Sequence, residues 1–121
     1  MVQTMDQRRA KHAWQVIKKL DSTNMNHFDT EIKKLPMRII TSGLGPAVAF
    51  LEAKQYAPTL RAALTDWINE RRPVKGKSNG LLERIAGEDA DFLQFATEES
   101  LAYLQWLVRF AEADDKAKDE E

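Results

Sequence analysis

The sequence predicts an all-α protein: a compact single-domain bundle of about five or six helices. Apolar residues recur along most of the 121-residue chain with the spacing of one helix face. Glycine and proline number only five and four, too few for the many turns of a β-sandwich. The apolar fraction of 43% and the charged fraction of 31% are typical of one globular domain of this length.

The first predicted helix runs from about Gln3 to Leu20. Its apolar residues follow helical spacing, and residues 21–24 (Asp-Ser-Thr-Asn) favour turns and therefore end it. Lys11 and Lys18 lie on its polar face. The opposite face is predicted to be buried and carries Ala10, Ala13, Trp14, Ile17 and Leu20.

Two prolines divide the segment that follows. Residues 28–34 form a short helix, and Pro36 is predicted to start a new one, because proline disfavours helical backbone at Leu35 but fits a first turn. Pro46 lacks a backbone donor, so we expect a kink or short break within residues 43–46, whose glycines allow another helix to approach closely. The buried face of the new helix is predicted to carry Ile40, Leu44, Ala47, Val48 and Leu51.

Two further helices are predicted on either side of a loop. Pro58 opens the first, which stops at Arg71-Arg72-Pro73, and residues 74–80 are the best loop candidate in the chain. Residues 81–87 form the short second helix. The buried stripe of the first carries Leu60, Ala63, Leu64, Trp67 and Ile68.

The last helix is predicted from about Asp91 to Ala113. Thr97 is typical of a helix start, either of a new helix or within a bent one, since the acids Glu98 and Glu99 after it suit a helix N-terminus. We interpret both acids as capping and solubilising charge. The helix is apolar nearly all round, which predicts a central place in the bundle or contact with a partner. Its predicted core or contact residues are Leu104, Trp106, Leu107 and Phe110.

The two ends of the chain differ from its middle. The amino-terminal residues lack the apolar run of a signal peptide, and no stretch approaches about 18 uninterrupted apolar residues, so we expect a cytoplasmic protein without a membrane span. Residues 114–121 (DDKAKDEE) are predicted to form an acidic, frayed tail. Residues 1–113 are assigned to one helical domain.

No pattern typical of catalysis or metal binding stands out. The chain has no cysteine and two histidines, His12 and His27, and the sequence couples neither to a nucleophile or an acid pair. We expect both histidines at the surface. Gly43-Leu-Gly45 lacks the preceding strand and the lysine of a phosphate-binding loop. The sequence therefore predicts a chain that is not an enzyme, with no catalytic residue, metal site or cofactor.

Charge is unevenly distributed along the chain. Residues 1–80 contain fourteen Lys or Arg against seven Asp or Glu, whereas residues 81–121 contain four against twelve. The basic part suits the phosphate backbone of a nucleic acid, and ordinary solvated charge accounts for it equally well. For Arg109 the alternative is an ion pair with Glu112. The candidate RNA-contact residues are Lys33, Lys34 and Arg38 around the expected bend at Pro36, together with Arg109, Lys11 and Lys18.

A helix–turn–helix that binds DNA is a competing interpretation of residues 58–87. A loop of roughly eight residues joins the two helices in place of the usual turn of about three or four. The helix that would read the major groove offers one basic residue, Arg84, and one acid, Glu83. The signal for DNA binding is therefore weak.

Three stretches of the sequence resemble one known family. They are QRRAKHA at residues 7–13, LPMRIITSGLGPAVAFL at residues 35–51 and ATEESLAYLQWLVRFAEA at residues 96–113. Each is similar to a motif of the small, fifth subunit of the Cmr complex, a type III-B CRISPR effector guided by RNA. The last stretch is the most specific, because helix-forming composition alone rarely produces W-L-x-R-F-A-E-A after T-x-E. Pro46 departs from the family pattern, which has a helix-compatible residue there.

The resemblance implies a helical bundle without a catalytic role that acts in antiviral defence. Copies of it would stack beside the backbone subunits of the complex and help to enclose the guide–target RNA. Its partners would be other Cmr subunits, further copies of itself, and guide and target RNA through their backbones, since the guide recognises sequence by base pairing. Two alternatives remain open: a regulatory or adaptor bundle that binds only protein, and the helix–turn–helix DNA binder.

Overall fold

The computed structural model describes residues 2–75 and 80–119, with side chains up to Asp114. Over these residues it contains six α-helices and no β-strand, which confirms the predicted all-α bundle. The helices are α1 (Met5–Lys18), α2 (Phe28–Ser42), α3 (Leu44–Lys54), α4 (Pro58–Arg71), α5 (Leu81–Gly87) and α6 (Ala90–Asp119).

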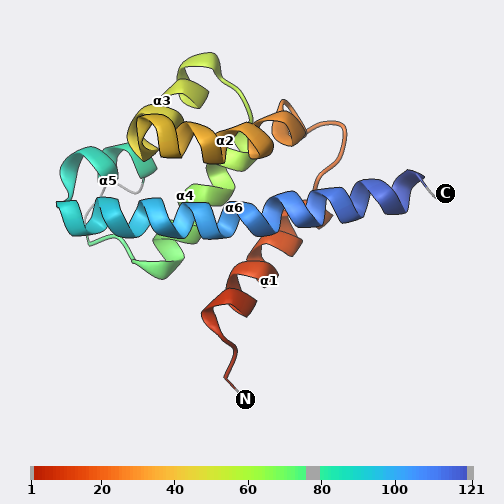
Figure 1. The fold of residues 1–121 in the computed structure, drawn as a ribbon, viewed down its shortest axis with the longest axis horizontal. Coiled ribbons are helices and arrows are strands. Elements are labelled where there is room, and N and C mark those ends of the chain that lie inside the picture. The colour runs from red at the N-terminus through yellow and green to blue at the C-terminus, as the bar shows by residue number, and fades with distance from the viewer. Residues whose placement is uncertain (1, 76–79, 120–121) are drawn as a thin grey trace.

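Helix α6 is the central element of the molecule. Figure 1 shows it running along the length of the bundle, with α1 on one side and α2 on the other. Helices α1, α2, α3 and α4 all pack against it. Because neighbours cover several of its faces, α6 needs apolar residues nearly all round, and its predicted central place is confirmed.

The most bulky part of the core lies where α4 meets α6. Trp67 of α4 and Tyr103 of α6 are both buried, and their rings stack with centroids 5.8 Å apart. Leu104 and Leu107 of α6 are buried as predicted, whereas Trp106 is only partly buried. The predicted stripe of α4 is confirmed in full, since burial extends to Leu60, Ala63, Leu64, Trp67 and Ile68.

A capping box begins α1. The Thr4 hydroxyl accepts a hydrogen bond from the Gln7 backbone N–H at 3.1 Å, and the Gln7 side chain accepts one from the Thr4 N–H at 2.8 Å. Ala13 and Ile17 face the core as predicted, but Trp14 remains 38% exposed. The apolar stripe of α1 is therefore only partly buried.

The predicted helix start at Pro36 is wrong, because Pro36 lies inside the continuous helix α2. Burial of Ile32, Leu35 and Ile39 on one face of α2 stabilises the helix more than the missing proline donor destabilises it. The chain breaks instead at Gly43, whose backbone has φ 92° and ψ 161°. The predicted break within residues 43–46 is thus confirmed, and Pro46 falls in the first turn of α3, where no donor is required.

This break also changes which residues are buried. The prediction that Ile40 shares a buried face with Leu44 is wrong, since Ile40 is 68% exposed and Leu44 is buried. The two residues belong to different helices on either side of Gly43. The spacing that places residues on one face of a single helix therefore does not apply to them. The expected close approach at the glycines is confirmed: a Cβ added at Gly45 would lie 3.4 Å from Cγ2 of Ile85 in α5.

The alternative that a new helix starts at Thr97 is wrong, because α6 is continuous from Ala90. The Thr97 hydroxyl donates a hydrogen bond to the Leu93 carbonyl at 2.7 Å, which is an ordinary contact inside a helix. The capping role belongs to Asp89, whose carboxylate accepts from the Phe92 N–H at 2.9 Å. At its other end α6 continues past Ala113 to Asp119.

Candidate nucleic-acid interface

Arg38 is held by contacts within the fold. Its guanidinium pairs with Glu31, whose carboxylate is buried, and lies over the Phe50 ring at 4.3 Å from the centroid. The neighbouring candidates Lys33 and Lys34 are exposed. Because α2 is continuous at Pro36, no bend collects these three side chains from two segments. Lys34 and Arg38 lie one turn apart on α2, and Lys33 is displaced around the helix.

Arg109 forms the ion pair that the sequence offered as its alternative role. Its Nη1 lies 3.5 Å from Oε2 of Glu112, one turn along α6, and its side chain is 76% exposed. An exposed pair of this kind holds its partners weakly. Arg109 therefore remains accessible to an anion, although part of its charge is already compensated.

Helix α1 presents an exposed cationic row. Arg8, Lys11 and Lys18 are all exposed and recur at spacings that place them on one side of the helix. Within the described part of the chain, none of the three forms an ion pair; Lys18 instead lies over the Trp14 ring, 5.9 Å from its centroid. Like the exposed Lys33 and Lys34 of α2, these three residues leave their positive charge available to an external anion.

A buried carboxylate joins three helices. Glu99 of α6 is 3% exposed and pairs with Arg9 of α1 and with Arg71 of α4, whose Nε lies 3.1 Å from Oε1. Burial by itself raises the pKa of Glu99, but the hydrogen bond from Arg9 and the charges of both arginines outweigh it, so the pKa lies below its ordinary value. The interpretation of Glu99 as solubilising charge is wrong, whereas Glu98 is exposed.

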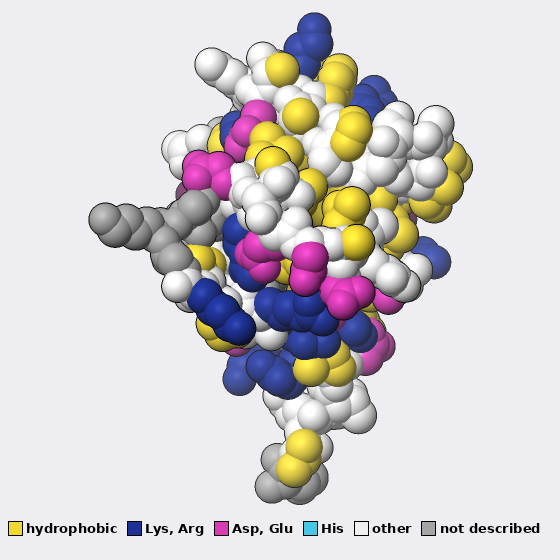
Figure 2. All heavy atoms as spheres, turned by 90° about the vertical axis from the view of Figure 1, so that its left-hand side faces the viewer, with side chains coloured by type: hydrophobic (Ala, Val, Ile, Leu, Met, Phe, Trp, Pro, Cys, Tyr) yellow, Lys and Arg dark blue, Asp and Glu magenta, His cyan; other side chains and the backbone are white. Residues whose placement is uncertain are grey.

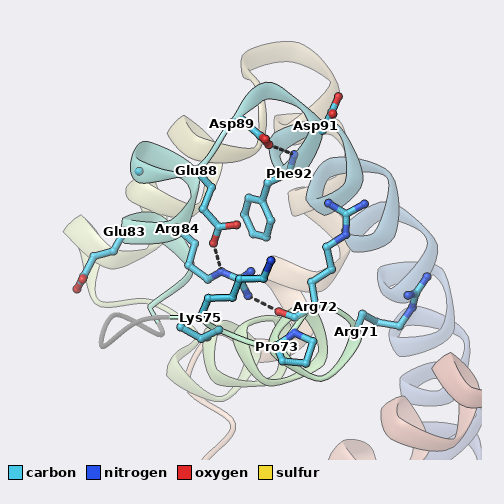
Figure 3. Close-up of a pocket in the computed structure, with 12 residues that line it drawn as sticks. Arg71, Arg72, Pro73, Lys75, Glu83, Arg84, Glu88, Asp89, Asp91 and Phe92 are labelled. Atoms are coloured by element: carbon cyan, nitrogen blue, oxygen red, sulfur yellow. Dashed lines mark hydrogen bonds and ion pairs between the residues drawn. The ribbon is translucent and has the colours of Figure 1, made fainter.

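Basic and acidic side chains meet at the end of the bundle formed by α4, α5 and α6. Figure 2 shows Lys and Arg side chains gathered beside Asp and Glu side chains on this face. A pocket of about 810 Å³ lies here (Figure 3). Arg72 and Lys75 line it on the α4 side, and Glu88 and Asp89 line it at the turn between α5 and α6. The carboxylates would repel an anion, so this pocket is a weaker candidate for binding RNA phosphates than the α1 row.

Arg84 does not serve as a base-reading residue. It is 5% exposed, pairs with Glu88, and donates to the Asn69 side chain at 2.8 Å and to the Arg72 carbonyl at 2.6 Å. Its guanidinium also lies over the Phe92 ring. The helix–turn–helix interpretation therefore loses the one basic residue that its reading helix offered.

His12 is not the surface residue that the sequence predicted. Its Nδ1 lies 2.6 Å from the Tyr103 hydroxyl and its Nε2 lies 2.7 Å from Oδ2 of Asp66, and only 13% of its side chain is exposed. His27 is exposed as predicted and stacks on Tyr56. Among the described residues, no three His, Asp or Glu side chains are grouped closely enough to hold a metal ion.

Comparison with known proteins decides the family. A family model described as CRISPR-associated protein (Cas_Cmr5) matches residues 5–114. The chain belongs to the Cas_Cmr5 family. The resemblance carried by the three sequence motifs is thereby confirmed, and the chain is a subunit of the type III-B CRISPR Cmr complex.

The Cas_Cmr5 match extends over all of the helical body. It begins at Met5, the first residue of α1, and reaches Asp114 in α6, so every helix contributes to it. No helix in the described part of this Cas_Cmr5 chain is both long and apolar enough to cross a bilayer.

Proposed function

We propose that this Cas_Cmr5 chain is a non-catalytic structural subunit that stacks beside the backbone subunits of the effector and contacts the guide–target RNA through its phosphates. It would act in the cytoplasm, in antiviral defence. The observation that carries the proposal is the exposed, unpaired cationic row of α1 on a chain whose whole helical body matches the family.

The α1 row has the dimensions and chemistry of a phosphate contact. With a rise of about 1.5 Å per residue, Arg8 and Lys18 lie roughly 15 Å apart along the helix axis. A cation that neutralises a phosphate releases a counterion from the nucleic acid, and this release favours binding. A cation without an intramolecular partner makes this contribution in full. Such contacts position the protein on the RNA without reading its sequence, which the guide does by base pairing. No nucleophile or metal is required for this role.

Helix α2 provides further proposed contacts. Lys33 and Lys34 are exposed and would meet the RNA backbone directly, whereas Arg38 would do so only while it also holds Glu31. On the same helix Met37 and Ile40 are 65% and 68% exposed and lie one turn apart. We assign this apolar pair to contact with another Cmr subunit or a further copy of the chain, because exposed apolar patches favour protein partners.

Salt-dependent binding of target RNA by the assembled complex tests the proposal. Replacing Arg8, Lys11 and Lys18 by glutamine should weaken binding regardless of target sequence. It should also lower the slope of log affinity against log salt by up to about 0.7 for each phosphate that is no longer neutralised. The matched control is Lys54→Gln, an exposed lysine near the end of α3. An unchanged slope with assembly intact would leave α1 outside the RNA interface and favour the adaptor that binds only protein.

A further inference from the structure

Trp14 is a large aromatic side chain at the surface between two lysines. Lys11, Trp14 and Lys18 follow each other at i, i+3 and i+7, so they form one line along α1. Trp14 is 38% exposed, and the Lys18 Nζ lies 5.9 Å from its ring centroid. An exposed aromatic ring between cations is the arrangement with which proteins hold single-stranded nucleic acid.

The Trp14 ring forms part of an open groove between α1 and α6. The ring meets Phe110 of α6 nearly edge-on, with centroids 5.0 Å apart, and Phe110 in turn contacts Trp106. These contacts hold the Trp14 ring in place from within the fold. The groove has a volume of about 510 Å³ and is lined by Gln3, Gln7, Ala10, Lys11, Trp14, Phe110 and Ala113.

The chemistry of the lining favours a nucleotide over an apolar helix. Among the described residues, the lining contains no carboxylate, while Lys11 contributes a positive charge. The Gln3 amide and the Nε2 group of Gln7, whose Oε1 is engaged in the capping box, supply hydrogen-bonding groups for the edge of a base. An apolar partner covering the groove would remove these polar groups from water without replacing their hydrogen bonds, which is unfavourable.

We propose that Trp14 is a stacking platform for one unpaired base of single-stranded RNA, with Lys11 and Lys18 holding the phosphates on either side. This inference rests on the proposed function, because it assumes that α1 contacts the RNA. It adds a contact between the protein and a base, whereas the proposed function requires contacts to the RNA phosphates alone. Lys11 and Lys18 lie about 10.5 Å apart along the helix axis, a span that two flexible lysine side chains can close around a single nucleotide.

Binding of short oligonucleotides to the full-length chain at low salt tests the inference. The probes are a single-stranded 12-mer of adenosines and the same backbone with abasic residues. Trp14→Leu should weaken binding of the adenosine 12-mer about tenfold, within the range measured for one stacked base, without changing the salt slope. Trp14→Phe keeps an aromatic face and should retain most of the affinity. The abasic probe should bind the parent and Trp14→Leu equally.

Leu93→Ala is the matched control. Leu93 is 39% exposed, as Trp14 is, but it lies in the first turn of α6 and does not line the groove. Its replacement should leave RNA binding unchanged. A difference spectrum between the parent and Trp14→Phe also isolates the fluorescence of Trp14, which should be quenched by the adenosine 12-mer and not by the abasic one.

Three outcomes would overturn the inference. If Lys11→Gln and Lys18→Gln lower the salt slope while Trp14→Leu binds as tightly as the parent, stacking is refuted and the proposed function stands. If the parent binds neither probe, the RNA-contacting function itself fails, and stacking with it. If Trp14→Leu binds RNA normally but no longer copurifies with the other Cmr subunits, the groove docks protein instead. Thermal melting of each variant identifies any loss of folding, in which case the Trp14 fluorescence result decides.

Discussion

His12, Asp66 and Tyr103 form a chain of hydrogen bonds across α1, α4 and α6. The Asp66 carboxylate only accepts, so the His12 Nε2 at 2.7 Å carries a proton. In the neutral ring Nδ1 then has a free lone pair and accepts from the Tyr103 hydroxyl at 2.6 Å. Burial and the charges of Asp66 and Glu70 raise the pKa of Tyr103, which keeps that hydroxyl a donor.

We therefore expect neutral His12 to adopt the tautomer protonated at Nε2. The ¹⁵N chemical shifts of the ring nitrogens, measured at a pH where the ring is neutral, check this directly. His27 is exposed and serves as the reference. A ring protonated at Nδ1 would contradict this hydrogen-bond chain, as would shifts that do not respond when Tyr103→Phe removes the donor.

Sequence reasoning could not find this chain of residues. Asp66 lies 54 residues from His12, and Tyr103 lies 91 residues from it. Helical spacing relates residues one or two turns apart and says nothing about which helices become neighbours. The one available signal was that His12 sits beside the apolar position Ala13, at the edge of the buried stripe.

The boundary between α2 and α3 depends on a single backbone conformation. Gly43 has φ 92° and ψ 161°, a region that only glycine occupies without strain. Gly43→Ala should lower the free energy of unfolding by about 1–3 kcal/mol. The cause would be backbone strain rather than crowding, because the added Cβ would meet no atom closer than the Pro46 Cδ at 3.8 Å.

Chemical denaturation checks this prediction, with Gly87→Ala as the control. A Cβ added at Gly87, the last residue of α5, meets nothing within 4 Å. That substitution should be neutral or slightly stabilising, because alanine favours a helix more than glycine does. Equal effects of the two substitutions would show that the break at Gly43 does not depend on glycine.

The two prolines show how far local rules extend at the scale of a helix. Pro46 and Pro36 have the same intrinsic preferences, yet Pro46 lies in a first turn and Pro36 lies inside α2. At Pro46 the preference of proline for the first turn of a helix agrees with the chain break at Gly43. At Pro36 the buried residues on both sides, Leu35 and Ile39, hold one continuous helix against the core. Tertiary packing overrides a local preference where the two conflict.

Over the whole molecule, opposite charges from the two parts of the chain meet inside the fold. Arg9 and Arg71 come from the basic part and Glu99 from the acidic part. Trp106 of α6 also donates to Asp6 in α1 at 2.9 Å. The charge asymmetry therefore contributes to internal stability, and the cations of α1 and α2 that remain exposed are the ones left for partners.

Stability should consequently depend on the ionisation of Glu99. Because its pKa is lowered by folding from an ordinary value of 4.5, its contribution is complete above about pH 4.5 and is lost as pH falls toward the folded-state pKa. At pH 7, Glu99→Gln should lower the free energy of unfolding by about 1.5–3 kcal/mol, the range for hydrogen bonds to a charged group. Below pH 4.5 the gap between variant and parent should narrow.

Denaturant unfolding at several pH values measures this effect. Glu98→Gln is the matched control, because Glu98 is the exposed neighbour of Glu99 on the same helix. Its stability should follow that of the parent at every pH. A gap between Glu99→Gln and the parent that stays constant down to pH 3 would show that Glu99 acts by shape rather than by charge.

The sequence by itself determined the fold class, the buried stripe of α4, the position of the α2–α3 break and the family. These properties rest on periodicity, on the backbone preferences of glycine and proline, and on local motifs, all of which act between residues near in the chain. The same kind of reasoning predicted the RNA contacts. It identifies charged residues but not the groups with which they pair in the fold. The predicted contacts are Lys33, Lys34, Arg38, Arg109, Lys11 and Lys18.

Only the tertiary structure decided which of those charges are available. It buried Glu31, the partner of Arg38, and packed Phe50 of α3 against the Arg38 guanidinium, and it left Lys11 and Lys18 unpaired beside the exposed Trp14. The pair of Arg109 with Glu112 lies within one turn of α6 and could already be proposed from the sequence. The physical reason is that a charge, or an aromatic face, is neutralised or covered by groups that lie close in space, whatever their distance in sequence. That proximity follows from how the six helices pack around α6, which no local pattern in the chain specifies.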